Sequence, residues 1–74
     1  MYYKRQYKMP YVKIEITRDG VTKEQKRALI KGVTQLLVDI LHKRPDQTHI
    51  VIQEIDTDNW GFDGEQTTEL IKQS

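Results

Sequence analysis

The chain has no cysteine, a single serine at its end and no glycine-rich loop. The lack of cysteine excludes disulfides, thiolate metal sites and a cysteine nucleophile. The serine, Ser74, has no histidine arranged with it as a nucleophile and base, and the two histidines do not have the spacing of a zinc site. Neither a metal nor a cofactor is therefore predicted.

The chain also has little hydrophobic content and almost no net charge. Only 36% of its 74 residues are hydrophobic, and the formal net charge is +1. No apolar run reaches membrane-spanning length, and no secretion signal is visible, so a cytoplasmic protein without membrane contact is expected. The charge makes nucleic acid an unlikely partner. A single small domain with so thin a core predicts burial through self-association.

What is present is a strand, a helix and a second strand. Residues 10–17 alternate apolar and polar side chains, which predicts a strand with one buried face. A capping box, with Thr22 as N-cap and Gln25 three residues on, opens a helix. Its apolar positions have helical spacing: Leu29, Val33, Leu36, Leu37 and Ile40. Residues 42–44 are basic and suit its C-terminal end, and Pro45 stops it. Residues 49–55 are almost continuously apolar, which is typical of an interior parallel strand.

This order predicts a β-α-β unit of the α+β class. Two parallel strands and one helix leave sheet edges open, and a twofold partner would extend the sheet to four strands. In the tail, residues 56–74, Asp63-Gly64 predicts a tight hairpin, while residues 66–73 fit either a short strand or a last helical turn. We expect an N-terminal extension, residues 1–9, followed by one domain, residues 10–74.

Several segments in this order resemble the 4-oxalocrotonate tautomerase family over residues 10 to about 72. They are Met9-Pro10 before the strand, Thr22-Lys23-Glu24-Gln25-Lys26 at the helix start, a Val/Ile-rich strand that ends in Glu54, and Trp60-Gly61-Phe62-Asp63-Gly64-Glu65. The resemblance implies a β-α-β subunit, dimers with a four-stranded sheet, and usually trimers of those dimers. It also implies an amino-terminal proline that moves a proton between carbon and oxygen in keto–enol chemistry.

The predicted catalytic residue is Pro10. As the first residue it carries a free secondary amine, whereas behind residues 1–9 its nitrogen is an amide without useful basicity. An ordinary α-amine has a pKa of about 7.7–8.0, a prolyl amine is more basic, and burial among apolar groups lowers the value toward a useful range for general acid–base catalysis. Trp60 and Phe62 are predicted to supply the apolar wall, although core or interface packing also accounts for Trp60.

Two positions depart from the pattern that the resemblance implies. Arginines that hold a substrate carboxylate are expected just after the first turn glycine and at the start of the second strand, where this chain has Val21 and His49. A dicarboxylate substrate is therefore doubtful. The predicted substrate-binding residues are His49, Arg18, Trp60, Phe62 and Tyr11. Arg18 also fits a solvated turn residue, and His49 an ordinary strand-edge histidine.

The extension has three interpretations. Its mixture of tyrosines and cations, Tyr2-Tyr3-Lys4-Arg5-Gln6-Tyr7-Lys8, suits contact with single-stranded nucleic acid. It also fits an upstream start codon, or an alternating segment that prolongs the first strand and pairs with a neighbouring subunit. The predicted function is a keto–enol tautomerase, acting on a small carbonyl acid as a homodimer or homohexamer when Pro10 is the free N-terminus. The alternative is a catalytically silent oligomeric relative in which the extension blocks Pro10.

Overall fold

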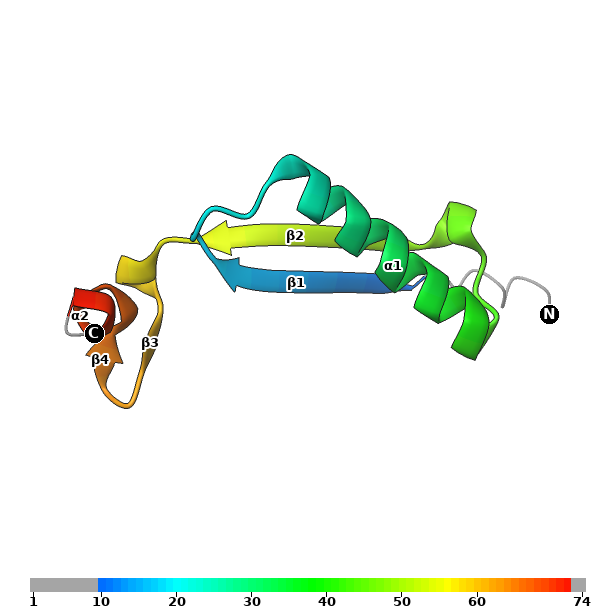
Figure 1. Ribbon diagram of the computed structural model, residues 1–74. Coiled ribbons are helices and arrows are strands. Elements are labelled where there is room, and N and C mark those ends of the chain that lie inside the picture. Colours follow the sequence, from blue (N-terminus) through cyan, green and yellow to red (C-terminus); the bar gives the residue numbers. More distant parts are fainter. Residues whose placement is uncertain (1–9, 73–74) are drawn as a thin grey trace.

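The computed structural model describes residues 10–72, and its centre is a β-α-β unit. Strand β1 (Tyr11–Thr17), helix α1 (Lys23–Leu41) and strand β2 (His49–Ile55) follow one another along the chain. The two strands pair in parallel, from Tyr11 opposite His49 to Thr17 opposite Ile55. Helix α1 crosses one face of this two-stranded sheet (Figure 1). The predicted β-α-β fold class is confirmed by this order and by the parallel pairing.

Helix α1 begins where the capping box predicts. The hydroxyl of Thr22 accepts a hydrogen bond from the Gln25 backbone N–H at 3.1 Å, and the Gln25 side-chain oxygen accepts one from the Thr22 N–H at 2.9 Å. The helix ends at Leu41, directly before the basic residues 42–44 that were predicted to lie at its C-terminal end. His42 adopts a left-handed conformation with φ of 56° and closes the helix. Arg44, two residues further on, pairs with Asp46.

The two faces of the sheet have different surroundings. On β1, Val12, Ile14 and Ile16 are half-buried toward α1, and the alternating residues between them are exposed. Strand β2 repeats the pattern, with Ile50 and Ile52 half-buried. Within one chain β2 has β1 as its partner, so the four-stranded sheet stays a prediction about the assembly.

The tail forms a small unit beyond the carboxyl end of β2 (Figure 1). It contains a 3-10 helix (Thr57–Asn59), strands β3 (Gly61–Phe62) and β4 (Glu65–Gln66), and helix α2 (Thr67–Lys72). The predicted hairpin is confirmed: Asp63 and Gly64 have φ values of 56° and 78° and form the turn between β3 and β4. Glycine suits its position because left-handed backbone costs it no steric strain. Residues 67–72 are helical, which answers the choice left open by the sequence.

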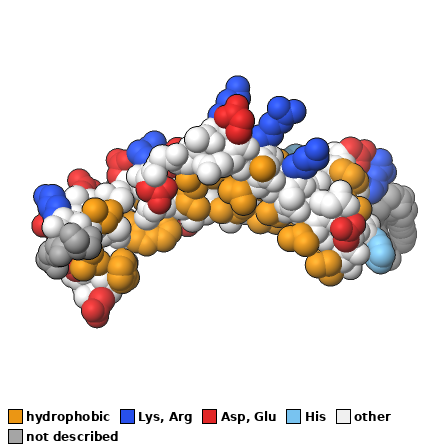
Figure 2. All heavy atoms as spheres, in the orientation of Figure 1, with side chains coloured by type: hydrophobic (Ala, Val, Ile, Leu, Met, Phe, Trp, Pro, Cys, Tyr) orange, Lys and Arg blue, Asp and Glu red, His pale blue; other side chains and the backbone are white. Residues whose placement is uncertain are grey.

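None of residues 10–72 is buried in the single chain. Hydrophobic side chains gather along one edge of the molecule in Figure 2. Several large hydrophobic side chains are exposed in the single chain. They are Tyr11, Leu29, Ile30, Leu36, Ile40, Leu41, Val51, Phe62 and Ile71. Between residues 10 and 72, no helix combines the length and apolarity needed to cross a membrane. The three interpretations of the extension concern residues outside the described range.

Candidate functional site

The first group of predicted site residues lies at the start of β1. Pro10 is half-buried, and its carbonyl oxygen accepts a hydrogen bond from the His49 backbone N–H at 3.0 Å. The parallel register places Tyr11 directly opposite His49. Because both side chains are exposed and lie on the face of the sheet away from α1, Pro10, Tyr11 and His49 form one cluster, which we call the proline end.

The segment before His49 fixes where β2 begins. Pro45–Gln47 forms a 3-10 helix, and the Thr48 hydroxyl donates to the Arg44 carbonyl oxygen at 2.7 Å. The Arg44 guanidinium donates two hydrogen bonds to the carboxylate of Asp46, at 3.1 and 2.7 Å. The arginine nearest in sequence to His49 therefore already has a carboxylate partner, Asp46.

The second group lies at the opposite end of β1. Trp60 and Phe62 line a hollow of about 470 Å³ together with Val21, Leu29 and Thr67. We call Trp60 and Phe62 the aromatic wall. Glu15, Ile16, Thr17 and Asp19 complete the lining of the hollow. The hydroxyl oxygen of Thr67 is buried there without a hydrogen-bond partner among the described residues.

The two groups are too far apart to act together within one chain. Eight residues separate Pro10 from Arg18, and a strand rises about 3.3 Å per residue, so the two ends of β1 lie about 26 Å apart. The structure therefore joins Pro10, Tyr11 and His49, and it joins Trp60 with Phe62. It does not bring these two groups into a single intrachain pocket.

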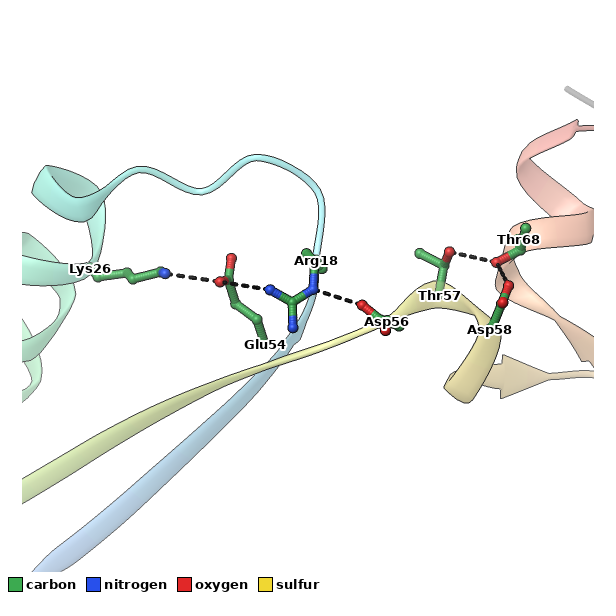
Figure 3. A network of polar contacts seen from close by, with 7 residues as sticks. All are labelled: Arg18, Lys26, Glu54, Asp56, Thr57, Asp58 and Thr68. Carbon is green, nitrogen blue, oxygen red and sulfur yellow. Dashed lines mark hydrogen bonds and ion pairs between the residues drawn. The ribbon is translucent and has the colours of Figure 1, made fainter.

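Arg18 belongs to a polar network at the far end of β1 (Figure 3). Its Nε donates to Asp56 Oδ1 at 2.7 Å, and its Nη1 lies 3.7 Å from Glu54 Oε1. The same Glu54 oxygen accepts a hydrogen bond from Lys26 Nζ on α1 at 2.9 Å. The hydrogen bond to Asp56, with the charge of that carboxylate, raises the pKa of the Arg18 guanidinium. The Arg18 guanidinium therefore contacts two carboxylates of its own chain. Its role as a substrate ligand stays a prediction.

Sequence reasoning did not anticipate the roles of Lys26, Glu54 and Asp56. The available signal was a carboxylate in an otherwise apolar strand, since Glu54 occupies a helix-facing position of β2 and only 17% of its side chain is exposed. A carboxylate at such a position needs a cationic partner. Lys26 in the second turn of α1 supplies it. Among residues 10–72, no three histidine, aspartate or glutamate side chains gather as metal ligands.

The chain is similar in sequence and structure to known tautomerases. A family model described as "Tautomerase enzyme" matches residues 10–70. The "Probable tautomerase K2" of Dickeya dadantii is 59% identical over 66 residues, which cover 89% of this chain and 98% of that protein. The 2-hydroxymuconate tautomerase of Pseudomonas putida is 36% identical, over 84% of this chain and 97% of its own. The crystal structure of DmpI from Helicobacter pylori aligns with a TM-score of 0.82 and 34% identity, over 88% of this chain and all of the other.

Proposed function

We propose that this chain, which belongs to the tautomerase family and is an isomerase, transfers protons through the nitrogen of Pro10 on a small carbonyl acid. One observation carries the proposal: the match to the family begins at Pro10 itself, where a first-residue proline has a free secondary amine. The half-buried position of Pro10 beside the exposed His49 also supports it.

The proposed reaction is a 1,3 proton shift. The unprotonated amine of Pro10 takes the hydroxyl proton of the enol, and the resulting ammonium delivers a proton to the carbon at the other end of the enolate. Negative charge develops on the substrate oxygen during this transfer, so a hydrogen-bond donor at that oxygen lowers the barrier. The exposed His49 side chain is the donor we assign. Tyr11, beside Pro10, contacts the apolar part of the substrate.

The aromatic wall reaches a proline end only from another subunit. About 26 Å separates the two ends of β1, so we assign Trp60 and Phe62 to the site of a neighbour in a homodimer or homohexamer. The exposed hydrophobic side chains of α1 favour such an assembly, because so many half-exposed leucines and isoleucines on one helix are unusual for a stable monomer. Burial by the wall would lower the pKa of the Pro10 amine.

Charge at the proline end favours a substrate with at most one carboxylate. At the proline end Arg44 is paired with Asp46, and a single histidine provides a weaker clamp than an arginine pair. Val21, which lines the hollow beside the aromatic wall, adds no charge when the wall of a neighbour completes the site. The dicarboxylate of a muconate-type substrate would leave one charge uncompensated. We therefore place a monocarboxylate, with an apolar group that packs against the aromatic wall, as the substrate class.

A comparison of two chains tests the proposal. One starts at Pro10, and the other starts at Met1 and keeps the extension. The assay monitors the ketonisation of enol-phenylpyruvate as a loss of ultraviolet absorbance. The rate should be at least ~10²-fold higher with the Pro10-start chain, because general acid–base catalysis contributes at least that factor. N-acetylation of the Pro10-start chain serves as a control, and it should remove the difference. Equal rates would support the silent oligomeric relative instead.

A further inference from the structure

The tail carries the aromatic wall but packs little against the rest of the subunit. Its 3-10 helix, hairpin and α2 contact one another, while none of these elements packs broadly on β1, β2 or α1 within the described range. Figure 1 shows the tail standing beyond the end of the sheet. The orientation of the tail relative to the β-α-β unit therefore depends on the short connection after Ile55 and on the side-chain contacts between this connection and the β-α-β unit.

The tail is a firmly connected unit. The Thr68 hydroxyl donates to Asp58 Oδ1 at 2.5 Å and lies 2.5 Å from the Thr57 hydroxyl, as Figure 3 shows. Gln66 Nε2 donates to the Asp58 carbonyl oxygen at 3.0 Å. In addition, the Thr67 N–H donates to the Trp60 carbonyl oxygen at 2.7 Å. Trp60 and Phe62 therefore move with the tail as a whole.

Among the described residues, a side-chain link joins the connection to the β-α-β unit. Asp56, the first residue after β2, receives the Nε hydrogen bond of Arg18. Arg18 also contacts Glu54, which Lys26 holds from α1. The Asp56 side chain does not cap the 3-10 helix that follows, so its carboxylate is directed to Arg18. The chain of contacts Lys26–Glu54–Arg18–Asp56 thus connects α1, β2 and β1 to the base of the tail.

We propose that Arg18 is a positioning residue: its link to Asp56 sets the direction of the tail and so places the aromatic wall over the proline end of a neighbouring subunit. This inference rests on the proposed function. It differs from the prediction that Arg18 binds the substrate carboxylate. An exposed Arg–Asp pair alone contributes little to stability; here its effect lies in geometry, because a small displacement of a wall residue lowers the rate out of proportion to the energy of the contact.

The two roles of Arg18 predict different results for Asp56. A positioning role requires both partners, so Arg18→Ala, Asp56→Ala and the double variant should have the same effect. A ligand role requires Arg18 alone, and Asp56→Ala would then leave activity intact. Folding should survive in each case, because the Arg18 backbone N–H keeps its 2.8 Å hydrogen bond to the Ile55 carbonyl oxygen.

The experiment uses Pro10-start chains and two probes, enol-phenylpyruvate and the enol of its methyl ester. Arg18→Ala, Asp56→Ala and the double variant should each lower kcat/KM by roughly 10-fold for both probes, within the ~10²-fold range of misplacement effects. Arg18→Lys should restore part of the loss. The acid limb of the pH profile should move to higher pH, since a displaced wall no longer lowers the pKa of the amine. Arg27→Ala, an exposed arginine on the outer side of α1, is the matched control.

Trp60 provides a readout that does not depend on activity, because it is the single tryptophan of the chain. In the Arg18 and Asp56 variants its emission should move to longer wavelength and acrylamide should quench it more strongly, while Arg27→Ala keeps the wild-type signal. Unchanged Trp60 emission in all variants would overturn the inference. A higher KM for the acid but not the ester in Arg18→Ala alone would instead make Arg18 a substrate ligand. If the wild-type chain is inactive but Trp60 emission still shifts in the variants, the proposed function is refuted, while the role of the Arg18–Asp56 contact in positioning the tail is retained.

Discussion

An apolar groove along α1 gives a sharp test of assembly. Leu36 is 56% exposed and lines an apolar groove of about 670 Å³ with Val21, Ala28, Leu29 and Gly32. Full burial of a leucine side chain contributes about 1.5–3 kcal/mol, so covering the exposed half of Leu36 contributes about 1–1.5 kcal/mol. In a twofold interface this term counts twice.

Leu36→Glu should therefore weaken subunit association strongly. Loss of burial alone removes about 2–3 kcal/mol per dimer, which is roughly 10²-fold in Kd. A carboxylate forced into an apolar contact adds a desolvation cost to this loss. Sedimentation velocity across a range of concentrations should show the variant shifted toward the 8.8 kDa monomer, whereas the wild type stays assembled.

Lys31→Glu is the matched control because it places the same carboxylate on the same helix, at an exposed position outside the groove. It should keep the wild-type mass. If Leu36→Glu keeps that mass as well, the groove is not a subunit interface. A wild-type chain that sediments as a monomer at micromolar concentration would refute the assembly itself.

Three further predictions concern the helix start, the oxygen-binding donor and the aromatic wall. Thr22→Ala removes the capping hydroxyl and should lower the free energy of unfolding by about 1 kcal/mol in denaturant titrations at fixed protein concentration; an unchanged midpoint would contradict the role of the capping box. His49→Ala in the Pro10-start chain should lower kcat by roughly 10²-fold if the side chain is the donor, and an unchanged kcat would assign that task elsewhere. Trp60→Ala should raise the pKa of the acid limb in the pH–rate profile, because water then reaches the amine and stabilises its charged form; a limb that stays in place would remove Trp60 from the site.

Local patterns were sufficient to predict the elements of the subunit. Thr22 and Gln25 predict the helix start because a capping box satisfies two backbone N–H groups within four residues. Asp63-Gly64 predicts the hairpin because both central positions of such a turn require positive φ. The basic residues 42–44 and Pro45 also predicted where α1 ends, to within a residue. The left-handed conformation of His42 at that end did not follow from the sequence.

The site was only partly predictable, since it depends on which residues meet in space. Parallel pairing brings His49 beside Pro10, and this follows from the order of the elements. That Arg18 turns toward Asp56 does not follow, because a turn arginine has many solvated conformations and the partner lies 38 residues away. The distance between Pro10 and Trp60 also becomes visible only when the tail is placed beyond the far end of the sheet.

The pKa of the Pro10 nitrogen gives the most direct test of the proposed proton transfer. In a Pro10-start chain labelled with ¹⁵N-proline, the Pro10 amine gives a pH-dependent signal. The nitrogen of Pro45, the only other proline, is an amide that does not titrate and serves as an internal reference. Below its pKa the amine is protonated and cannot accept the substrate proton, so kcat/KM should fall as pH drops through that value. We predict that the amine pKa measured by NMR coincides with the acid limb of kcat/KM in the same buffer; full activity at a pH where the Pro10 amine is protonated would contradict its role as the base.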